Sequence, residues 1–240
     1  NKIYQESIQN PEKFWQNVSE DIFWFKKPSK ILNKSNPPFY KWFEDGVTNT
    51  CYNAIDTHID KGNGDKIALI YDSPITNNKA KFTYNELREK ISKFAGALHN
   101  QGIKKGDRVI IYMPMIPEAV IAMLACGRIG AIHSVVFGGF ASNELASRID
   151  DSKAKILITA SCGFEPGRTV EYRPLVDGAL KLAKHKVEKV IFFQRKGFEV
   201  KLNSPLEISW EESLINAKNK DCVEIGANEF AYILYTSGTT

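Results

Sequence analysis

The sequence predicts an α/β protein built on a mostly parallel β-sheet that is flanked by helices. From Cys51 onward, short apolar runs with strand character alternate with helix-periodic segments of about ten residues or more. Helices of this length are the usual crossovers between parallel strands, and they cover both faces of the sheet. With 43% hydrophobic and 25% charged residues among 240, the chain has the composition of a globular protein with a sizeable core.

The expected elements carry recognisable start and stop signals. Thr83 and Glu86 form the pattern of a capping box at the start of one helix, which Gly102 is placed to end. Pro117 stands where a helix-opening proline belongs. The predicted strands are 67–71, 108–112, 131–137, 155–160, 190–194 and 230–235. The helices predicted after the capped one are 117–129, 142–151, 174–185 and 210–217.

Residues 1–50 differ from the remainder, residues 51–240, and we expect the two parts to be distinct. The first part shows little periodicity and is punctuated by Pro28, Pro37 and Pro38. Its aromatic residues include Phe14, Trp15, Phe23, Trp24, Phe25, Phe39, Tyr40, Trp42 and Phe43. Such a segment usually wraps over a larger body and inserts its aromatic side chains, so we expect a packing extension without chemistry of its own.

Charge and cysteine usage exclude several classes of function. The net charge is only +4 and the basic residues are dispersed, which disfavours nucleic acid as a partner. The most apolar stretch, 109–137, is interrupted by prolines and charges, so it lacks the roughly 20 uninterrupted apolar residues of a membrane span. Cys51, Cys126, Cys162 and Cys222 show no CxxC and no metal-ligand spacing, so no metal site is expected. With no leader-like segment after Asn1, free thiols in the cytoplasm or the mitochondrial matrix are expected.

Three loops with small or unusual residues follow predicted strands. In an open α/β sheet, ligands bind beyond the carboxyl ends of the strands, so these loops are candidate binding elements. The first contains Gly138 and Gly139, which permit close approach of a ligand but are also typical of a tight turn. The second contains Glu165, Pro166, Gly167 and Arg168. The third contains Thr236, Ser237, Gly238, Thr239 and Thr240.

The second and third loops suggest phosphate contacts. Pro166 and Gly167 suit the centre of a type II turn, which would direct the phosphate-matching fork of Arg168 to one place. An arginine on a surface turn is an equally good interpretation. The third loop offers hydroxyl donors and a backbone freed by Gly238, as phosphate oxygens require. A solvent-facing turn is the alternative.

Other titratable residues suggest structural roles. His133 lies within an apolar strand and is expected to be a hydrogen-bonded core histidine rather than a catalytic base. Asp150 and Asp151 end a predicted helix beside Arg148 and are expected to be a solvated charge cluster. No nucleophilic triad and no carboxylate pair stands out.

Together these motifs resemble the short-chain acyl-CoA synthetases of the adenylate-forming superfamily. Residues 235–240, YTSGTT, are similar to the opening of that superfamily's signature loop. Residues 112–119, YMPMIPEA, and 130–140, GAIHSVVFGGF, are similar to the acetyl- and propionyl-CoA synthetase branch. Residues 161–168, SCGFEPGR, resemble the propionyl-CoA synthetase version, with acetyl-CoA synthetase next. The resemblance implies the N-terminal part of the large domain of an adenylate-forming enzyme.

The resemblance also implies an ATP-dependent acid–thiol ligase acting on propionate or acetate. Such an enzyme uses ATP carrying Mg²⁺ to form an acyl-adenylate, and CoA then displaces AMP. By the family pattern, residues 236–240 would hold ATP phosphates, residues 165–168 would contact the nucleotide end of CoA, and Gly138 and Gly139 would flank its pantetheine arm. The expected partners are therefore small molecules, and the oligomeric state is not indicated.

Two departures from the family pattern qualify this interpretation. Acetyl-specific relatives carry an additional arginine near Glu165, so one cationic contact to CoA is absent or replaced here. The chain also stops at Thr240, within the signature loop, so we expect an incomplete site and an inactive fragment. The alternative is a non-catalytic α/β module that binds CoA or nucleotide. A structural protein that docks through its aromatic N-terminal segment is the least favoured reading.

Overall fold

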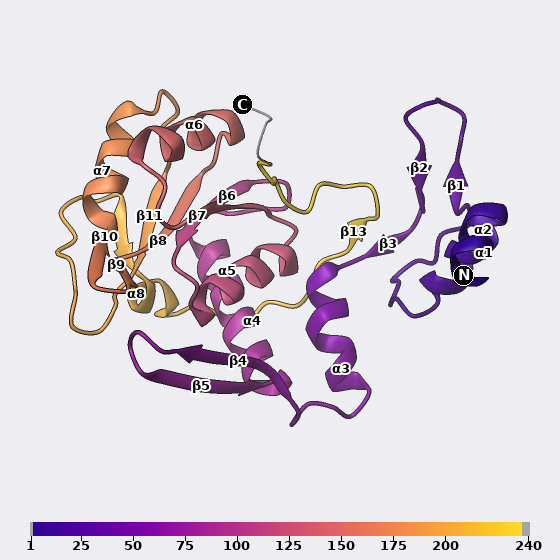
Figure 1. The fold of residues 1–240 in the computed structure, drawn as a ribbon, viewed down its shortest axis with the longest axis horizontal. Coiled ribbons are helices and arrows are strands. Elements are labelled where there is room, and N and C mark those ends of the chain that lie inside the picture. The colour runs from indigo at the N-terminus through magenta and orange to yellow at the C-terminus, as the bar shows by residue number, and fades with distance from the viewer. Residues whose placement is uncertain (1, 237–240) are drawn as a thin grey trace.

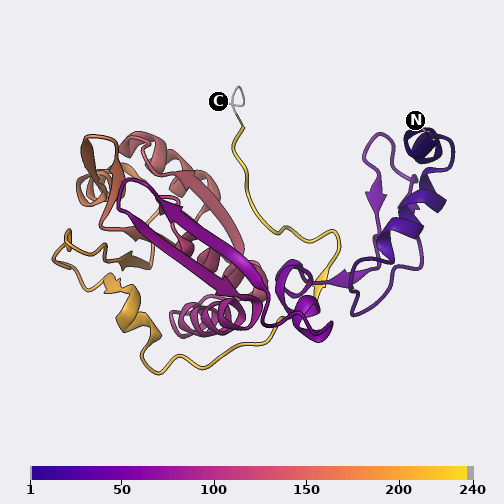
Figure 2. The ribbon, with the colours of Figure 1, turned by 60° about the horizontal axis from the view of Figure 1, so that its bottom comes forward.

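The computed structural model describes residues 2–236. The chain forms an α/β body and an N-terminal arm that is set apart from it (Figures 1 and 2). The arm comprises α1 (Lys2–Gln9), α2 (Pro11–Ser19), β1 (Leu32–Asn33) and β2 (Lys41–Trp42), and β3 (Val47–Thr48) leads from it into the body.

A five-stranded, wholly parallel sheet lies at the centre of the body, with strand order β12-β11-β8-β6-β7. The strands are β6 (Arg108–Met113), β7 (Ile132–Phe137), β8 (Ile156–Ala160), β11 (Lys189–Phe193) and β12 (Glu207–Ser209). The two central strands are apolar and buried along almost their whole length, as expected for strands covered on both faces. The predicted α/β class and parallel sheet are confirmed.

Two layers of helices cover this sheet. α4 (Tyr84–Asn100) packs against α5 (Pro117–Arg128), and α6 (Ser142–Ser152) packs against α7 (Tyr172–Leu182). α5 connects β6 to β7 in one direction across the sheet, whereas α6 connects β7 to β8 in the other. Right-handed crossovers in opposite directions place their helices on opposite faces. No helix within residues 2–236 is long and apolar enough to cross a bilayer.

The helix signals in the sequence act as predicted. Thr83 Oγ1 accepts a hydrogen bond from Glu86 N at 3.2 Å, and the Glu86 carboxylate accepts one from Thr83 N at 2.8 Å. Gly102, with φ +87°, follows the end of this helix, and Pro117 opens α5. Ser209 and Glu212 form a second capping box that starts α8 (Trp210–Leu214).

Two antiparallel hairpins were not predicted. β4 (Ile67–Ser73) pairs with β5 (Asn78–Thr83), and β9 (Cys162–Glu165) pairs with β10 (Arg168–Glu171). The sequence indicated only the first of these four strands. β5 is polar and half exposed, and β9 and β10 have four residues each, so neither hairpin produces a clear apolar alternation.

The strand predicted at 230–235 is wrong. Tyr232 forms one parallel bridge to His133 of β7, and Ile233 N donates to His133 O at 2.9 Å, but no ladder continues within the described residues. The apolar side chains that suggested the strand are largely exposed, with Phe230 at 80% and Leu234 at 67%. A short strand that precedes this segment, β13 (Ile225–Gly226), instead pairs antiparallel with β3.

The prediction for the N-terminal segment is also wrong in two respects. The segment contains two helices, although its aromatic spacing suggested little periodicity. Its aromatic rings pack mainly on one another, as where Trp15 meets Trp42 at 6.1 Å, and Phe39 is 75% exposed. Contact with the body includes the junction, where the aromatic ring of Phe23 lies 4.4 Å from that of Tyr52 in the π-helical turn η1 (Tyr52–Asp56), which α3 (Thr57–Asp60) continues. It also includes a hydrogen bond of 2.8 Å from Asn228 Nδ2 to Trp42 O of β2.

Candidate functional site at the switch point of the sheet

The direction of the strand connections changes between β6 and β8. The helices that follow these neighbouring strands, α5 and α7, cover opposite faces, so a crevice opens between the carboxyl ends of the two strands. Open α/β sheets bind their ligands at such a switch point. A cleft of about 290 Å³ lies there, close to the lower limit of small-molecule sites. Its lining comprises Tyr71, Ser73, Met113, Pro114, Met115, Ile116, Val135, Val136, Phe137, Gly138, Gly163, Phe164, Glu165, Tyr172 and Arg195.

Most walls of this switch-point cleft are apolar. The loop after β6 contributes Met115, which is 88% exposed, and the end of β7 contributes Phe137, which is 69% exposed. Exposed apolar side chains beside a few polar groups are typical of a surface that binds an organic ligand. The hairpin strand β4 closes one side with Tyr71 and Ser73.

Gly138 lines the cleft, and the buried side chain of Tyr172 beside it leaves no room for a larger residue. The hydroxyl of Tyr172 donates to Gly138 O at 2.6 Å. A Cβ at position 138 would lie 2.1 Å from that hydroxyl and 2.7 Å from Met113 O. Burial raises the pKa of Tyr172 above its usual value, so the hydroxyl remains a proton donor. Gly139 lies beside the Phe137 ring and is not among the residues that line the cleft.

The predicted turn at Pro166 and Gly167 is present at the tip of the β9–β10 hairpin. Gly167 has φ +75°, which the second central residue of a type II turn requires. The turn brings Arg168 opposite Glu165, where the guanidinium and carboxylate form an ion pair of 2.6 Å. Glu165 lines the cleft, whereas Pro166, Gly167 and Arg168 stand beyond its described lining, and the Arg168 side chain is 71% exposed.

Arg195 is a cleft residue that the sequence analysis missed. It follows β11, its residue is only 8% exposed, and its guanidinium lies 4.9 Å from the centre of the Phe164 ring. Its backbone N donates to Ser161 Oγ at 2.8 Å, which fixes the position of the residue. Within residues 2–236 no carboxylate forms an ion pair with this guanidinium, so its charge is available to an anion. The carboxyl-end rule applied to β11 would have identified it.

A second charged group lies near Arg195. Glu118, in the first turn of α5, is half-buried, and burial raises its pKa while the charge of Arg195 opposes the rise. The raised pKa means that this carboxylate is poorly solvated and gains from a nearby positive charge. Arg195 is the one positively charged residue among the described residues that line the cleft.

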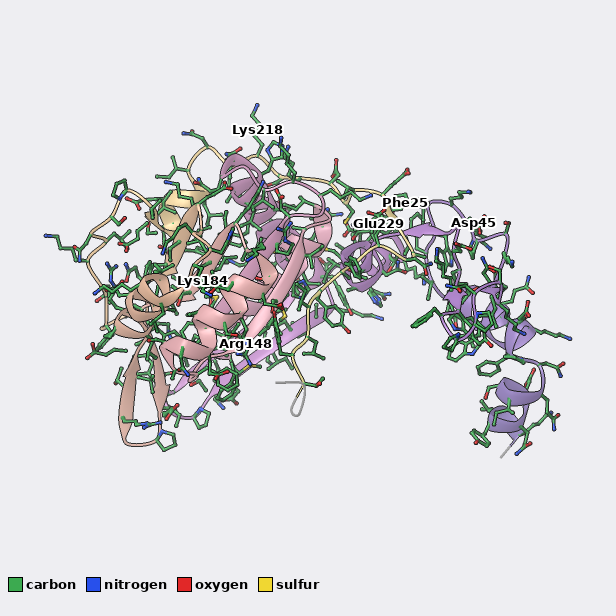
Figure 3. All side chains as sticks on the ribbon, turned by 90° about the horizontal axis from the view of Figure 1, so that it is seen from above. Phe25, Asp45, Arg148, Lys184, Lys218 and Glu229 are labelled. Carbon is green, nitrogen blue, oxygen red and sulfur yellow. The ribbon has the colours of Figure 1, made fainter. Side chains whose placement is uncertain are left out.

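The predicted phosphate segment begins at the edge of the described structure. Of its five residues Thr236 is described, and Ser237, Gly238, Thr239 and Thr240 lie outside the described residues. Just before it, the Tyr235 hydroxyl donates to Asp151, and the Arg148 guanidinium lies 4.9 Å from the Tyr235 ring. Burial and this hydrogen bond raise the pKa of Tyr235 to about 12. The predicted phosphate segment therefore begins next to α6, near Arg148 (Figure 3). Thr236 is not among the residues that line the cleft.

Two expectations about titratable residues need correction. His133 is in a core strand, but its buried Nδ1 has no hydrogen-bond partner within residues 2–236, so it is not a satisfied core histidine. Burial lowers its pKa to about 4, and its place near the amino end of β7 is far from the carboxyl-end cleft. Asp150 and Asp151 are not simply solvated, because Asp150 accepts from His185 N at 2.7 Å and Asp151 accepts from Tyr235.

One group of potential metal ligands occurs among the described residues. Sulfur atoms of Cys51 and Cys222 and a carboxylate oxygen of Asp56 lie within 4.8 Å of one another. No spacing pattern in the sequence indicates this group, because Asp56 and Cys222 are 166 positions apart. Two thiols do not suit Mg²⁺, which requires oxygen ligands.

The chain, with this α/β fold and switch-point cleft, belongs to the AMP-binding enzyme family. The model of that family matches residues 56–240, and the model described as acetyl-coenzyme A synthetase N-terminus matches residues 1–54. The resemblance noted in the sequence is therefore confirmed.

Individual relatives lie among the short-chain acyl-CoA synthetases. The chain is 54% identical over 235 residues to the human mitochondrial acyl-CoA synthetase short-chain family member 3, covering 98% of this chain and 34% of that protein. It is 43% identical over 240 residues to acetyl-coenzyme A synthetase of Streptomyces coelicolor, covering 37% of that protein. The solved acetoacetyl-CoA synthetase of Streptomyces lividans shares the fold, with a TM-score of 0.87 at 24% identity over 98% of this chain and 36% of that one. The chain thus spans about a third of these relatives.

Proposed function

We propose that the whole protein is an AMP-forming short-chain acyl-CoA synthetase that activates propionate or acetate with ATP and CoA. The observation that carries this proposal is the apolar cleft at the switch point, which bears one arginine without an ion pair within residues 2–236, in a chain of the AMP-binding family. An apolar channel with a positive group at its rim matches CoA, which has a flexible pantetheine arm and a charged nucleotide end. The names of the human and Streptomyces relatives support this reaction class.

ATP is proposed to bind through residues 236–240. In the proposed reaction the carboxylate attacks the α-phosphorus, and pyrophosphate leaves with the acyl-adenylate retained. Hydroxyl and backbone N–H donors of Thr236, Ser237, Gly238, Thr239 and Thr240 would hold the β- and γ-phosphates and stabilise the developing charge. The anchoring of Tyr235 on α6 supports this role, because a fixed stem lets the loop present its donors without further ordering. Mg²⁺ would arrive with ATP.

CoA is proposed to enter along the cleft before its thiol displaces AMP. Gly138 and Gly139 would leave space beside the pantetheine arm, and Glu165, Pro166 and Gly167 would form the rim that presents Arg168. Arg168 would exchange Glu165 for a phosphate of CoA. This exchange is inexpensive because the exposed ion pair contributes little to stability.

The division of the chain belongs to the same proposal. We assign residues 1–50 to an N-terminal extension and residues 51–240 to part of the AMP-binding domain. The separate arm and the two family-model matches support a boundary in this region. We place the protein in the cytoplasm or the mitochondrial matrix, and the mitochondrial naming of the human relative supports the latter.

The test uses Gly238→Val in the whole protein. Propionate-dependent exchange of pyrophosphate into ATP should be lost, because a β-branched residue restricts the backbone and fills space required by phosphate oxygens. The thermal unfolding midpoint should change little, since the substitution removes no buried apolar side chain. Gly197→Val, which has open space around it but a φ of +81° that valine rarely adopts, is the control that measures how far backbone strain at a glycine alone lowers the unfolding temperature. Normal folding together with normal exchange in Gly238→Val would contradict the phosphate role.

A non-catalytic module that binds CoA or nucleotide is the second candidate. The small cleft volume favours it for the 240-residue chain studied alone, which we expect to be inactive. Purified whole protein that binds CoA but shows neither pyrophosphate exchange nor acyl-CoA formation with propionate or acetate would establish this alternative.

A further inference from the structure

Two cysteines from distant parts of the sequence meet inside the body. Cys51 directly precedes η1 and is fully buried, whereas Cys222 lies on the connection between α8 and β13 and is half-buried. Both carry free thiols, and their sulfur atoms lie within 4.8 Å of each other and of Asp56. The reaction proposed above uses neither cysteine.

A buried arginine joins the two thiols to Asp56. The Arg128 guanidinium donates to Asp56 Oδ2 at 2.7 Å and to Asp56 Oδ1 at 3.0 Å. Its Nη1 also lies 3.1 Å from Cys222 Sγ and 3.7 Å from Cys51 Sγ. A fixed positive charge beside a thiol favours the thiolate, which is the reactive form. Accordingly, a hydrogen bond from Cys222 and the charge of Arg128 lower the pKa of Cys51 despite its burial.

The backbone on both sides of the pair is held in place by the buried amide of Asn49. Its Nδ2 donates to Gly127 O and to Val223 O, each at 2.9 Å, and its Oδ1 accepts from Cys51 N at 2.9 Å. Val223 N donates to Arg128 O at 2.9 Å. Because both cysteines sit next to fixed peptide groups, rotation of their side chains is the motion available to bring the sulfurs into bonding distance.

These contacts favour thiol oxidation over metal binding. Two sulfurs and a carboxylate would be reasonable ligands for Zn²⁺. However, both oxygens of Asp56 are already engaged by Arg128, and a cation at the cluster would face the guanidinium at short range. The same positive charge that repels a cation stabilises a thiolate.

We propose that Cys51 and Cys222 form a reversible intramolecular disulfide when the protein is exposed to hydrogen peroxide. A thiolate of the pair attacks the O–O bond of hydrogen peroxide, giving a sulfenic acid and releasing one water after protonation. The second sulfur then displaces the hydroxyl group as another water, and the S–S bond forms. Two thiols and one peroxide thus give one disulfide and two waters, the sulfurs being oxidised and the peroxide reduced. Cys222 supplies the opening to solvent.

The bond would link the segment before η1 covalently to the connection that leads towards residues 236–240. It would close a loop between positions 51 and 222, and long closed loops restrict the unfolded chain most. The oxidised protein should therefore unfold at a temperature higher by about 5 °C or more. Reduction with dithiothreitol should reverse the change.

The test treats the whole protein with hydrogen peroxide, blocks remaining thiols and maps the peptides by mass spectrometry without reduction. We expect a linked peptide that contains Cys51 and Cys222 and disappears on reduction. Cys51→Ala and Cys222→Ala should each abolish both the link and the shift in unfolding temperature. Cys126→Ala is the matched control, because burial raises the pKa of Cys126 to about 12 and it takes no part in the cluster.

The wild-type measurement decides the proposal even if a variant folds poorly. Absence of the linked peptide, under conditions in which peroxide oxidises the half-buried Cys222 to a sulfinic acid, would overturn it. Stoichiometric zinc in the purified protein, lost in Cys51→Ala, would also overturn it by showing that the cluster is a metal site.

Discussion

The guanidinium of Arg168 lies 2.6 Å from the carboxylate of Glu165, which faces it across the β9–β10 turn. The ion pair joins Glu165, which lines the cleft, to Arg168, which we predict binds a phosphate. Glu165 therefore competes with an incoming phosphate for the same guanidinium.

Arg168→Ala should raise the Michaelis constant for CoA about ten- to a hundredfold, the range for a lost hydrogen bond to a charged group. Pyrophosphate exchange, which needs no CoA, should stay near wild type. Glu165→Gln should act in the opposite direction and lower that constant by at most about fivefold, since the exposed pair is weak. Equal losses in both half-reactions of Arg168→Ala would show that the residue is structural.

Arg195→Ala should weaken CoA binding as well, because it removes a positive group of the cleft lining that forms no ion pair within residues 2–236. Arg195→Lys keeps the charge but loses the planar contact with Phe164, so it should fall between wild type and alanine. Isothermal titration of the whole protein with CoA checks this order. Lysine and alanine variants with the same affinity would contradict an electrostatic role.

Gly138→Ala should destabilise the fold by about 1–3 kcal/mol, since the added methyl would overlap the Tyr172 hydroxyl. Tyr172→Phe in the same chain removes that oxygen and should recover part of the loss, although Tyr172→Phe alone costs about 1 kcal/mol. Urea unfolding of the two single variants and the double variant measures the coupling. Strict additivity would mean that the close approach of Gly138 to Tyr172 is not what selects glycine.

His133 should make the protein less stable as the pH falls from about 6.5 to about 4. Burial lowers the pKa of His133 in the folded state to about 4. Between about pH 6.5 and pH 4, the imidazole is therefore protonated in the unfolded chain but neutral in the folded chain. The stability lost is up to about 3 kcal/mol. His133→Leu should flatten this part of the curve of unfolding free energy against pH. An unchanged slope in that variant would assign the dependence to other groups.

The parallel sheet and its helices were predictable because their signals are local. The capping box at Thr83 and the proline at position 117 mark helix starts that need no tertiary contact to be recognised. The strand predicted around Tyr232 failed for the opposite reason. Its apolar run is real, but pairing requires a ladder on the β7 edge, and only one bridge forms there within the described residues.

For the candidate site as well, features with a local sequence signal were predictable, and features that depend on distant contacts were not. The turn at Gly167 follows from a dipeptide, and the structure confirms it. Arg195 stands alone in the sequence, and only the approach of β11 to β8 brings it to the cleft. The group of Asp56 with Cys51 and Cys222 depends on contact between segments some 170 positions apart, which no spacing rule detects.

The long-range hydrogen bond of Asn49 also affects folding during translation. Its buried amide donates to Val223 O, a residue synthesised 174 positions later. At about 5–20 residues per second, a ribosome needs roughly 9–35 s to supply that partner. During this interval the buried side chain of Asn49 lacks this acceptor. The start of the body therefore gains its contact with the last described segment only after most of the chain has been made.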